Sequence, residues 1–403
     1  MPASVQAESD QVATNAGIPP EAVLKPSTGE LFATFLRIGV TAFGGPAMIA
    51  FIRKRVVAEK KWISPDTFQS GVALCQAIPG ATVMQMAGYI GLQLQGVRGA
   101  IASFVGFGFP AFLLMLSLSA IYSQTHELPT FVAIFSGLQA LIVGVIANAA
   151  ITFGKASLKG WRDCAIAVVA AALFGLRINP VFIIATSALL GMALNHGLPQ
   201  KTPPSKPSNS TLRPLGLLLL LSAIFLSSLL YLQPDLFRLS MLMSKIDLIA
   251  FGGAFGSVPL MFHEVVEARQ LMDGPTFLNG IVLGQFTPGP IVITATFVGY
   301  LLYGLSGAVV ASLGIFTPSF LILVGVAPWF DRLRAMSWFN RSIRGILCSF
   351  VGLLFTVTLQ FAWNVSWGWP HIVIALGTLA ALFYKVDLLW VVLVGGTISA
   401  FVL

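Results

Sequence analysis

Long apolar segments are the feature of this chain that most restricts its fold. Several of them reach the ~20 residues that a helix needs to cross the hydrocarbon core of a bilayer. They lie at 99–123, 129–153, 214–232, 305–327 and 343–363. Of the 403 residues 56% are hydrophobic and only 9% are charged, whereas roughly a quarter of a soluble domain is charged. The sequence therefore predicts an all-α polytopic membrane protein whose partner is the lipid bilayer.

The formal net charge of +8 does not indicate a nucleic-acid partner. Basic residues gather in short segments between the apolar stretches, as the positive-inside bias of cytoplasmic loops predicts. Those segments hold Arg53, Lys54, Arg55, Lys60 and Lys61, then Lys155, Lys159 and Arg162, and then Arg332, Arg334, Arg341 and Arg344. No nucleic-acid-binding motif accompanies them. Three cysteines and four histidines lack metal-ligand spacing, so we expect no metal, no cofactor and no catalytic residue.

The sequence repeats itself with a period of about 208 residues. Phe-Gly-Gly at 43–45 returns at 251–253, and Gln-Ala-Ile-Pro-Gly at 76–80 returns as Gln-Phe-Thr-Pro-Gly at 285–289. An ordered series of such matches indicates duplication. We expect a polar tail at 1–28, a first repeat at 29–195, a linker with an extra span at 196–235, and a second repeat at 236–403.

The loop charges favour repeats of opposite orientation. The loop at 51–64 is basic, whereas its counterpart at 258–276 is mainly acidic. The loop after the second long span is basic only in the first copy, and the connection between the two long spans is basic only in the second. Under the positive-inside rule, opposite charge places the loops on opposite sides of the membrane. Each copy is predicted as one helix ending at Phe-Gly-Gly, a polar loop, two short pieces broken at Pro-Gly, two long spans and two short apolar segments. The crossings fit inversion only if at least one segment is re-entrant, and the residues leave open which one.

The paired breaks are the predicted substrate site. Matching Gly/Pro interruptions expose backbone N–H groups and helix N-termini near the midplane, which favours an anion. Six residues before each Phe-Gly-Gly stands a basic residue, Arg37 or Lys245, and an intramembrane cation is a functional-site hypothesis by default. The alternatives are kinking and close packing at the breaks, snorkelling of Arg37, and neutralisation of Lys245 by Asp247.

Neutral hydrogen-bond donors stand near the breaks, namely the side chains of Gln76, Gln85, Gln285, Thr294 and Thr296. Such donors suit an anion that must bind and then leave. The alternative is that these side chains form hydrogen bonds between helices. Acidic residues are scarce in the predicted spans, which argues for an anion carrier rather than a cation carrier. The predicted substrate-binding residues are Arg37, Phe43, Gly44, Gly45, Gln76, Pro79, Gly80, Gln85, Lys245, Phe251, Gly252, Gly253, Gln285, Thr287, Pro288, Gly289 and Thr294.

At these motifs the sequence resembles the chromate ion transporter family in its long, two-domain form. The matching segments are 37–46, 76–91, 245–253 and 285–290. The resemblance implies a secondary transporter of a bacterial inner membrane that exports chromate by alternating access and confers chromate resistance. Sulfate is implied as a close analogue. Many relatives have a second proline where this chain has Ala81, and a polar residue near Ala47-Met48-Ile49, which bears on the preferred anion.

Two other classes of function stay open at this point: a carrier for another small solute or cation, and a membrane-embedded protein that handles lipid headgroups. The oligomeric state is likewise open between a monomer and a homodimer.

Overall fold

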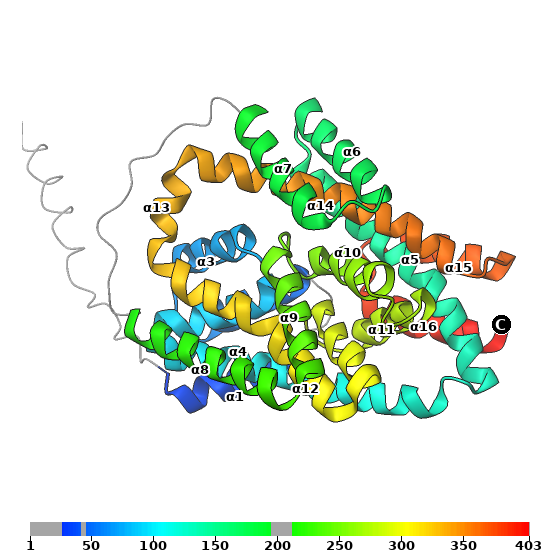
Figure 1. Ribbon diagram of the computed structural model, residues 1–403, viewed down its shortest axis with the longest axis horizontal. Coiled ribbons are helices and arrows are strands. Elements are labelled where there is room, and N and C mark those ends of the chain that lie inside the picture. The colour runs from blue at the N-terminus through cyan, green and yellow to red at the C-terminus, as the bar shows by residue number, and fades with distance from the viewer. Residues whose placement is uncertain (1–25, 42–45, 195–211, 403) are drawn as a thin grey trace, which may run out of the picture.

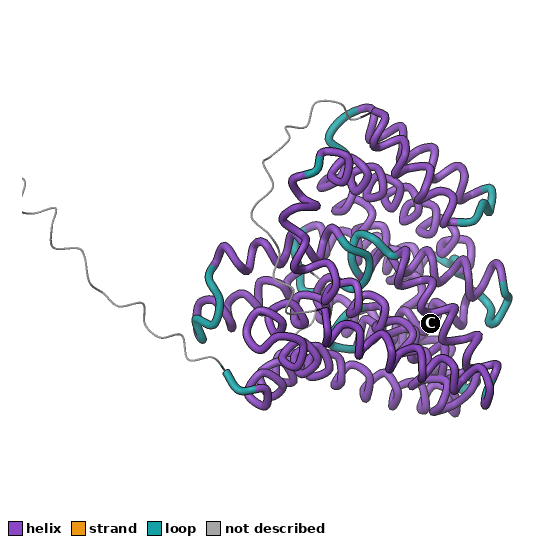
Figure 2. Tube along the Cα trace, turned by 60° about the vertical axis from the view of Figure 1, so that its left-hand side comes forward, coloured by secondary structure: helices purple, strands orange, loops and turns teal. Residues whose placement is uncertain are grey.

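The computed structural model describes residues 26–41, 46–194 and 212–402, and all regular structure within these ranges is helical (Figures 1 and 2). The predicted all-α fold is confirmed. The first repeat contains α1 (Thr28–Thr41), α2 (Pro46–Arg53), the π-helix η1 (Lys54–Glu59), α3 (Pro65–Ala77), α4 (Thr82–Thr125), α5 (Pro129–Ser157), α6 (Trp161–Gly175) and α7 (Pro180–Leu194).

The second repeat follows α8 (Leu212–Leu232) and has the same order of elements. It contains α9 (Pro234–Ile249), η3 (Ala254–Gly256), α10 (Ser257–Phe262), the π-helix η4 (His263–Ala268), α11 (Gly274–Phe286), η5 (Ile291–Ile293), α12 (Thr294–Val326), η6 (Ala327–Trp329), α13 (Phe330–Ala335), α14 (Ser337–Asn364), α15 (Trp369–Phe383) and α16 (Leu388–Val402).

Within the described residues, five helical segments are long and apolar enough to cross a membrane. They are Thr82–Thr125, Pro129–Ser157, Arg213–Leu232, Ile291–Ala335 and Ser337–Asn364. Each of them contains one of the five apolar stretches read from the sequence, so that prediction is confirmed. The extra span between the repeats forms α8, whereas most of the predicted linker before it lies outside the described residues.

The duplication is visible in the backbone. Gly80 and Gly289, at the two Pro-Gly breaks, have φ of +112° and +119°. The helix after each polar segment is capped in the same way, because Ser64 accepts the N–H of Thr67 and Asp273 accepts the N–H of Thr276. These equivalent details recur at the sequence period, so the two repeats share one local fold.

A tight bend divides α4 and α12 into two parts. Within α4, Gly96 has φ +62° and ψ −151°, a conformation that favours glycine; Gly304 repeats it in α12 with +62° and −146°. The two parts cross closely, because a Cβ on Gly91 would lie 2.1 Å from the carbonyl oxygen of Gly99. The part of α4 before its bend and the 13-residue α3 each extend only about 20 Å, short of the ~30 Å hydrocarbon core.

The prediction of a polar loop after the first Phe-Gly-Gly was wrong, because the chain forms α2 and η1 at residues 46–59. Met48, Ile52 and Val56 are buried at a spacing of four residues, which puts them on one face of the helix. The charged residues of this segment lie on its other faces. The charge density of the segment hid this amphipathic pattern.

The repeats pack by exchanging helices. Helix α14 packs against α6 and α7 of the first repeat, and its equivalent α5 packs against α15 and α16 of the second (Figure 1). Small residues allow the backbones to approach, as is usual between membrane helices. A Cβ on Gly345 would lie 2.1 Å from the carbonyl oxygen of Ser187, and one on Gly144 would lie 2.7 Å from that of Ala375.

This packing predicts a matched pair of substitutions. Gly345→Ala should destabilise the protein by about 1–3 kcal/mol, because the added methyl meets fixed backbone at the α7–α14 contact. Gly377→Ala, in α15, adds a methyl with no neighbour within 4 Å and should not lower the unfolding midpoint, because alanine is the better helix former. Thermal unfolding of the purified protein in detergent measures both; equal midpoints for the two variants would contradict the proposed close packing.

Candidate functional site

The Pro-Gly breaks are buried, and each contacts the other repeat. The Gly80 N–H donates to the carbonyl oxygen of Ala250 at 2.8 Å, and a Cβ on Gly80 would lie 2.3 Å from the Ser319 Cβ. A Cβ on Gly289 would lie 3.0 Å from the Cβ of Ala111. Because Ser319 and Ala111 occupy equivalent positions, the two breaks make reciprocal contacts, as in a twofold-related interface.

A helical segment begins directly after each break without a side-chain cap. The N-cap residues are Ala81 before α4 and Pro290 before η5, and neither makes a side-chain hydrogen bond to the first turn. The start of α4 also approaches the second repeat, since a Cβ on Gly253 would lie 3.0 Å from Thr82 Oγ1. Helix N-termini with unused N–H groups favour negative charge.

Two glutamines at the breaks carry polar atoms without partners among the described residues. Gln85 is fully buried; its Nε2 donates to the Pro79 carbonyl, and its Oε1 is unpartnered. Gln285 is 9% exposed, and its Nε2 is unpartnered. A buried unused amide donor is costly and suggests a missing acceptor. Gln76, the sequence counterpart of Gln285, is instead exposed on α3.

The predicted threonines use their donors locally. Thr287 Oγ1 donates to the Leu283 carbonyl oxygen at 2.9 Å, and Thr294 Oγ1 donates to the Ile291 carbonyl oxygen at 2.8 Å. Their hydroxyl hydrogens are therefore occupied within their own segments in this conformation. A role in substrate binding stays a prediction for both, as it does for the buried Pro288.

Of the two Phe-Gly-Gly motifs, the structure describes only the second. Gly252 and Gly253 have φ of +84° and +83°. A Cβ on Gly252 would lie 2.6 Å from the ring of Phe153, and Phe251 is half-buried. The motif therefore lies between the repeats. Its counterpart, Phe43-Gly44-Gly45, lies outside the described residues.

Helix α9 satisfies the backbone groups freed by the proline in α12. Pro318 has no N–H to give to the Gly314 carbonyl, and the Ser244 hydroxyl donates to that carbonyl at 3.1 Å. Asp247 Oδ2 accepts the N–H of Ser319 at 2.7 Å. Asp247 is 1% exposed, so this buried carboxylate holds the kink beside the break of the first repeat.

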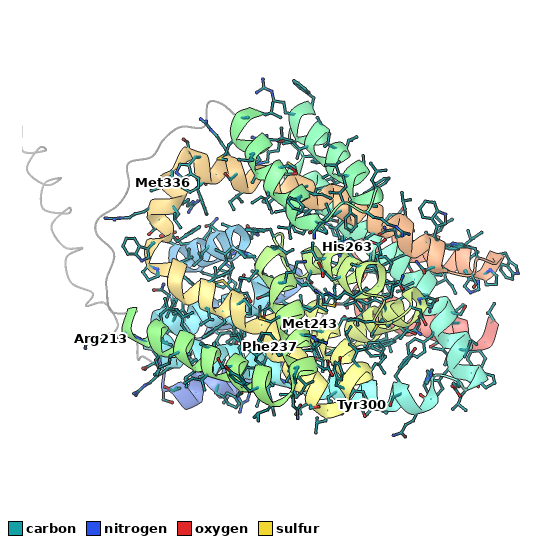
Figure 3. All side chains as sticks on the ribbon, viewed as in Figure 1. Arg213, Phe237, Met243, His263, Tyr300 and Met336 are labelled. Carbon is teal, nitrogen blue, oxygen red and sulfur yellow. The ribbon has the colours of Figure 1, made fainter. Side chains whose placement is uncertain are left out.

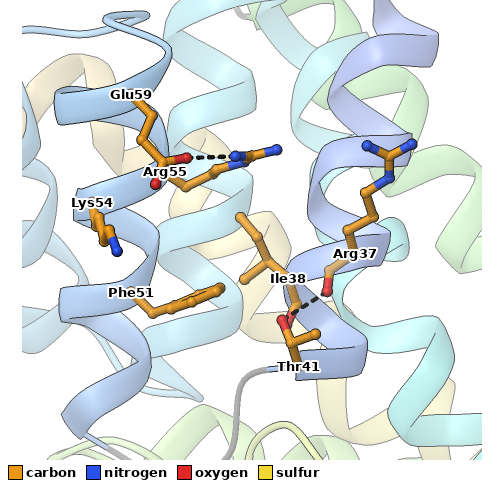
Figure 4. Close-up of a pocket in the computed structure, with 7 residues that line it drawn as sticks. All are labelled: Arg37, Ile38, Thr41, Phe51, Lys54, Arg55 and Glu59. Atoms are coloured by element: carbon orange, nitrogen blue, oxygen red, sulfur yellow. Dashed lines mark hydrogen bonds and ion pairs between the residues drawn. The ribbon is translucent and has the colours of Figure 1, made fainter.

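Arg37 lies on one wall of a cavity of about 190 Å³ between α1 and the α2–η1 segment (Figure 4). The opposite wall carries Lys54, Arg55 and Glu59, and of these Arg55 and Glu59 form an ion pair. Arg37 is exposed and makes no ion pair within the described part of the chain. Cationic side chains outnumber the carboxylate, so the cavity attracts anions. Its lining reaches Thr41, the last residue of α1.

Lys245 occupies the equivalent place in the second repeat with different partners. Its Nζ forms an ion pair with Glu264, which is 6% exposed, and Glu264 also pairs with Arg269 at 3.3 Å. The predicted alternative, that Asp247 neutralises Lys245, is therefore wrong, because the carboxylate that pairs with Lys245 is Glu264. The sequence analysis placed Glu264 in a loop and so missed it. The signal was alignment of the repeats, which sets Glu264 opposite Arg55.

Comparison with known proteins gives a family match in both repeats. The family model described as chromate transporter matches residues 29–192 and 237–400. An uncharacterized transporter of Methanocaldococcus jannaschii is 43% identical over 372 residues, covering 91% of this chain and 92% of the relative. A chromate transport protein of Pseudomonas aeruginosa is 29% identical over 391 residues, covering 92% and 88%.

A shorter relative, an uncharacterized transporter of Bacillus subtilis, is 31% identical over 170 residues. The match covers 42% of this chain and 80% of that protein. The matched length is close to that of one repeat. No solved structure matches the chain.

The contact between Asp247 and Ser319 predicts a graded effect of substitution. Asp247→Leu removes the acceptor and should destabilise the protein by about 1–3 kcal/mol, because it leaves a buried N–H unpaired. Asp247→Asn keeps an acceptor oxygen and should retain most of the stability. Thermal unfolding in detergent measures the difference, and equal loss in both variants would exclude hydrogen bonding to the kink as the role of Asp247.

Proposed function

Because this chain belongs to the chromate transporter family, we propose that it is a secondary transporter that exports chromate across the cytoplasmic membrane, with sulfate as an analogue. The inner membrane of a bacterium and a role in chromate resistance belong to the same proposal. The two repeats would expose a shared site to each side in turn, by alternating access.

One observation carries the proposal: the buried Pro-Gly breaks of the two repeats contact each other's repeat. Two uncapped helix starts, at 82 and 291, and the unpartnered Nε2 of Gln285 lie at these breaks. A tetrahedral oxyanion presents acceptor oxygens in several directions and matches N–H donors from more than one element. These donors are neutral, which allows release as well as binding.

The charge on the cavity beside Arg37 supports an entry path. Lys54 and Arg55 line its opposite wall, and a concave surface of one sign concentrates oppositely charged ligands. Thr41, which lines the cavity, stands two residues before Phe43 of the first Phe-Gly-Gly in the sequence. An anion drawn into the cavity would thus reach the end of α1.

The membrane potential is a sufficient driving force for export. With the interior negative, moving a dianion outward through the whole field releases about 4.6 kcal/mol per 100 mV, twice the value for one charge. This transport requires no ATP.

The helical pairs support the inverted arrangement. Glu30 at the start of α1 pairs with Lys60 just after η1 at 2.7 Å, so the chain returns to its starting level after α2 and η1. Helix α3 and the short first part of α4 form a second, re-entrant pair. The remaining spans of the first repeat also come in pairs: the long part of α4 with α5, and α6 with α7. With these even numbers of crossings, the single helix α8 would give the second repeat the opposite orientation, as inversion requires.

The transport proposal predicts a specific role for Gln285. Gln285→Met keeps the size of the side chain but removes the unused donor, and a hydrogen bond to a charged ligand is worth about 1.5–3 kcal/mol. The KM for chromate should therefore rise roughly tenfold or more. Uptake of radiolabelled chromate into everted membrane vesicles measures it.

Gln233→Met is the matched control, because Gln233 is exposed before α9; it should behave as wild type. An unchanged KM in Gln285→Met would remove Gln285 from the site. Absence of saturable, potential-dependent uptake in the wild type would overturn the transport proposal.

Inversion predicts that equivalent loops lie on opposite sides of the membrane. Single cysteines placed at Lys61 and at Gln270, the equivalent turn residues with φ of +50° and +49°, should differ in labelling by an impermeant maleimide. The Lys61 position should react in everted vesicles and the Gln270 position in intact cells. Labelling of both from the same side would refute inversion.

A further inference from the structure

We propose that His263 and Glu267, on the π-helix of the second repeat, form a proton-binding site, and that protons bound there are exchanged for the transported oxyanion. The exchange rests on the proposed transport function, whereas the site itself is defined by the contacts of this cluster.

The geometry couples two titratable groups away from solvent. His263 Nδ1 lies 2.9 Å from Glu267 Oε2, and their side chains are 8% and 11% exposed. Phe174 of α6 covers the imidazole, with 5.8 Å between the ring centroids; Figure 3 shows His263 among the packed helices. The sequence analysis placed this histidine near a span end or loop. Histidine beside a carboxylate is the usual side-chain pair for taking up and releasing a proton near neutral pH.

Gln360 of α14 gives the cluster a neutral neighbour that suits both protonation states. Its Nε2 donates to Glu267 Oε1 at 2.9 Å, whereas its own Oε1 is buried and unpartnered within the described residues. An amide has one donor end and one acceptor end. The donor end serves the carboxylate, and rotation of the amide offers the acceptor end to a protonated carboxyl group. The unpartnered oxygen can thus accept a hydrogen bond from Glu267 once that carboxyl group is protonated.

Two basic and two acidic side chains make up the charged groups of this cluster. Lys245 from α9 and Arg269 after the π-helix both pair with Glu264. The two basic side chains and the two glutamates of the cluster carry equal and opposite formal charges. The contacts recorded from α14 and α6 are the neutral Gln360 and Phe174. One added proton therefore changes the net charge of the cluster from zero to positive.

This cluster is the repeat-related equivalent of the cavity beside Arg37. His263 aligns with Lys54, Glu264 with Arg55, and both pairs lie on π-helices of six residues. The first repeat thus holds fixed positive charge on the wall of a cavity, and the second holds protonatable groups that are buried. In an inverted repeat, equivalent places open to opposite sides in turn. Protons taken up on one side and anions taken up on the other give exchange rather than cotransport.

Proton movement in proteoliposomes tests the proposal. With the potential clamped by potassium and valinomycin, at an alkaline pH where chromate is a dianion, external chromate should raise the lumenal pH, read by a trapped dye. A tenfold proton gradient, acid inside, should accumulate chromate roughly tenfold for each proton exchanged. Glu267→Gln should abolish both effects, while exchange of chromate for chromate at equal pH persists.

Glu127→Gln is the matched control, because Glu127 also adjoins a histidine, His126, but is 91% exposed; it should behave as wild type. Chromate exchange without proton movement in the wild type would overturn the inference and leave the transport function standing. A fall in lumenal pH on addition of chromate would mean that protons enter together with chromate, and it would overturn the proposed exchange. Retained proton coupling in Glu267→Gln would remove this cluster from the pathway. No chromate exchange in the wild type would instead contradict the transport function.

Discussion

Satisfaction of backbone hydrogen bonds inside a bilayer is the constraint on which this structure depends. The hydrocarbon core offers no water to a broken helix, so each group freed by a proline or glycine needs a partner from the protein. Here partners come from another helix or from the other repeat: the Gly80 N–H reaches Ala250, and the Ser319 N–H reaches Asp247. The breaks therefore hold the two repeats in register. In the proposed transport cycle, an N–H group released at such a place would become available to a substrate.

The repeats keep one backbone but have diverged in charge. Asp247 holds the Pro318 kink in the second repeat, whereas the equivalent residue in the first is Gly39, whose Cβ would meet the Phe107 carbonyl at 2.4 Å. In the first repeat, α1 and α4 therefore pack backbone to backbone at Gly39, where the second repeat has the buried Asp247. The same divergence separates the basic cavity beside Arg37 from the Lys245–Glu264 pair. The two repeats thus share a backbone fold but present different charges at equivalent positions.

The sequence predicts the elements of this fold better than it predicts their contacts. Span length and the recurrence of Pro-Gly depend on local pattern, so the five long helices and the duplication could be read directly. The helix at 46–59 was missed because charge density suggested a loop while Ile52 and Val56 carried the helical period. The Lys245–Glu264 pair joins two different helices across the Phe-Gly-Gly break, and the exposure of Gln76 depends on how α3 packs. Neither has a local signal.

Helix α8 lies between the two repeats and bears on how their loop charges could diverge. The Bacillus subtilis relative matches only 170 residues, about the length of one repeat. A single repeat that needed an inverted partner would have to insert in both orientations, and its loops could not carry a strong charge bias in either sense. In the proposed inverted arrangement, joining two copies through one extra span gives each copy a fixed orientation within a single chain. Each repeat is then free to fix its own loop charges, and the basic segment around Arg55 and the acidic segment around Glu264 are what that freedom permits.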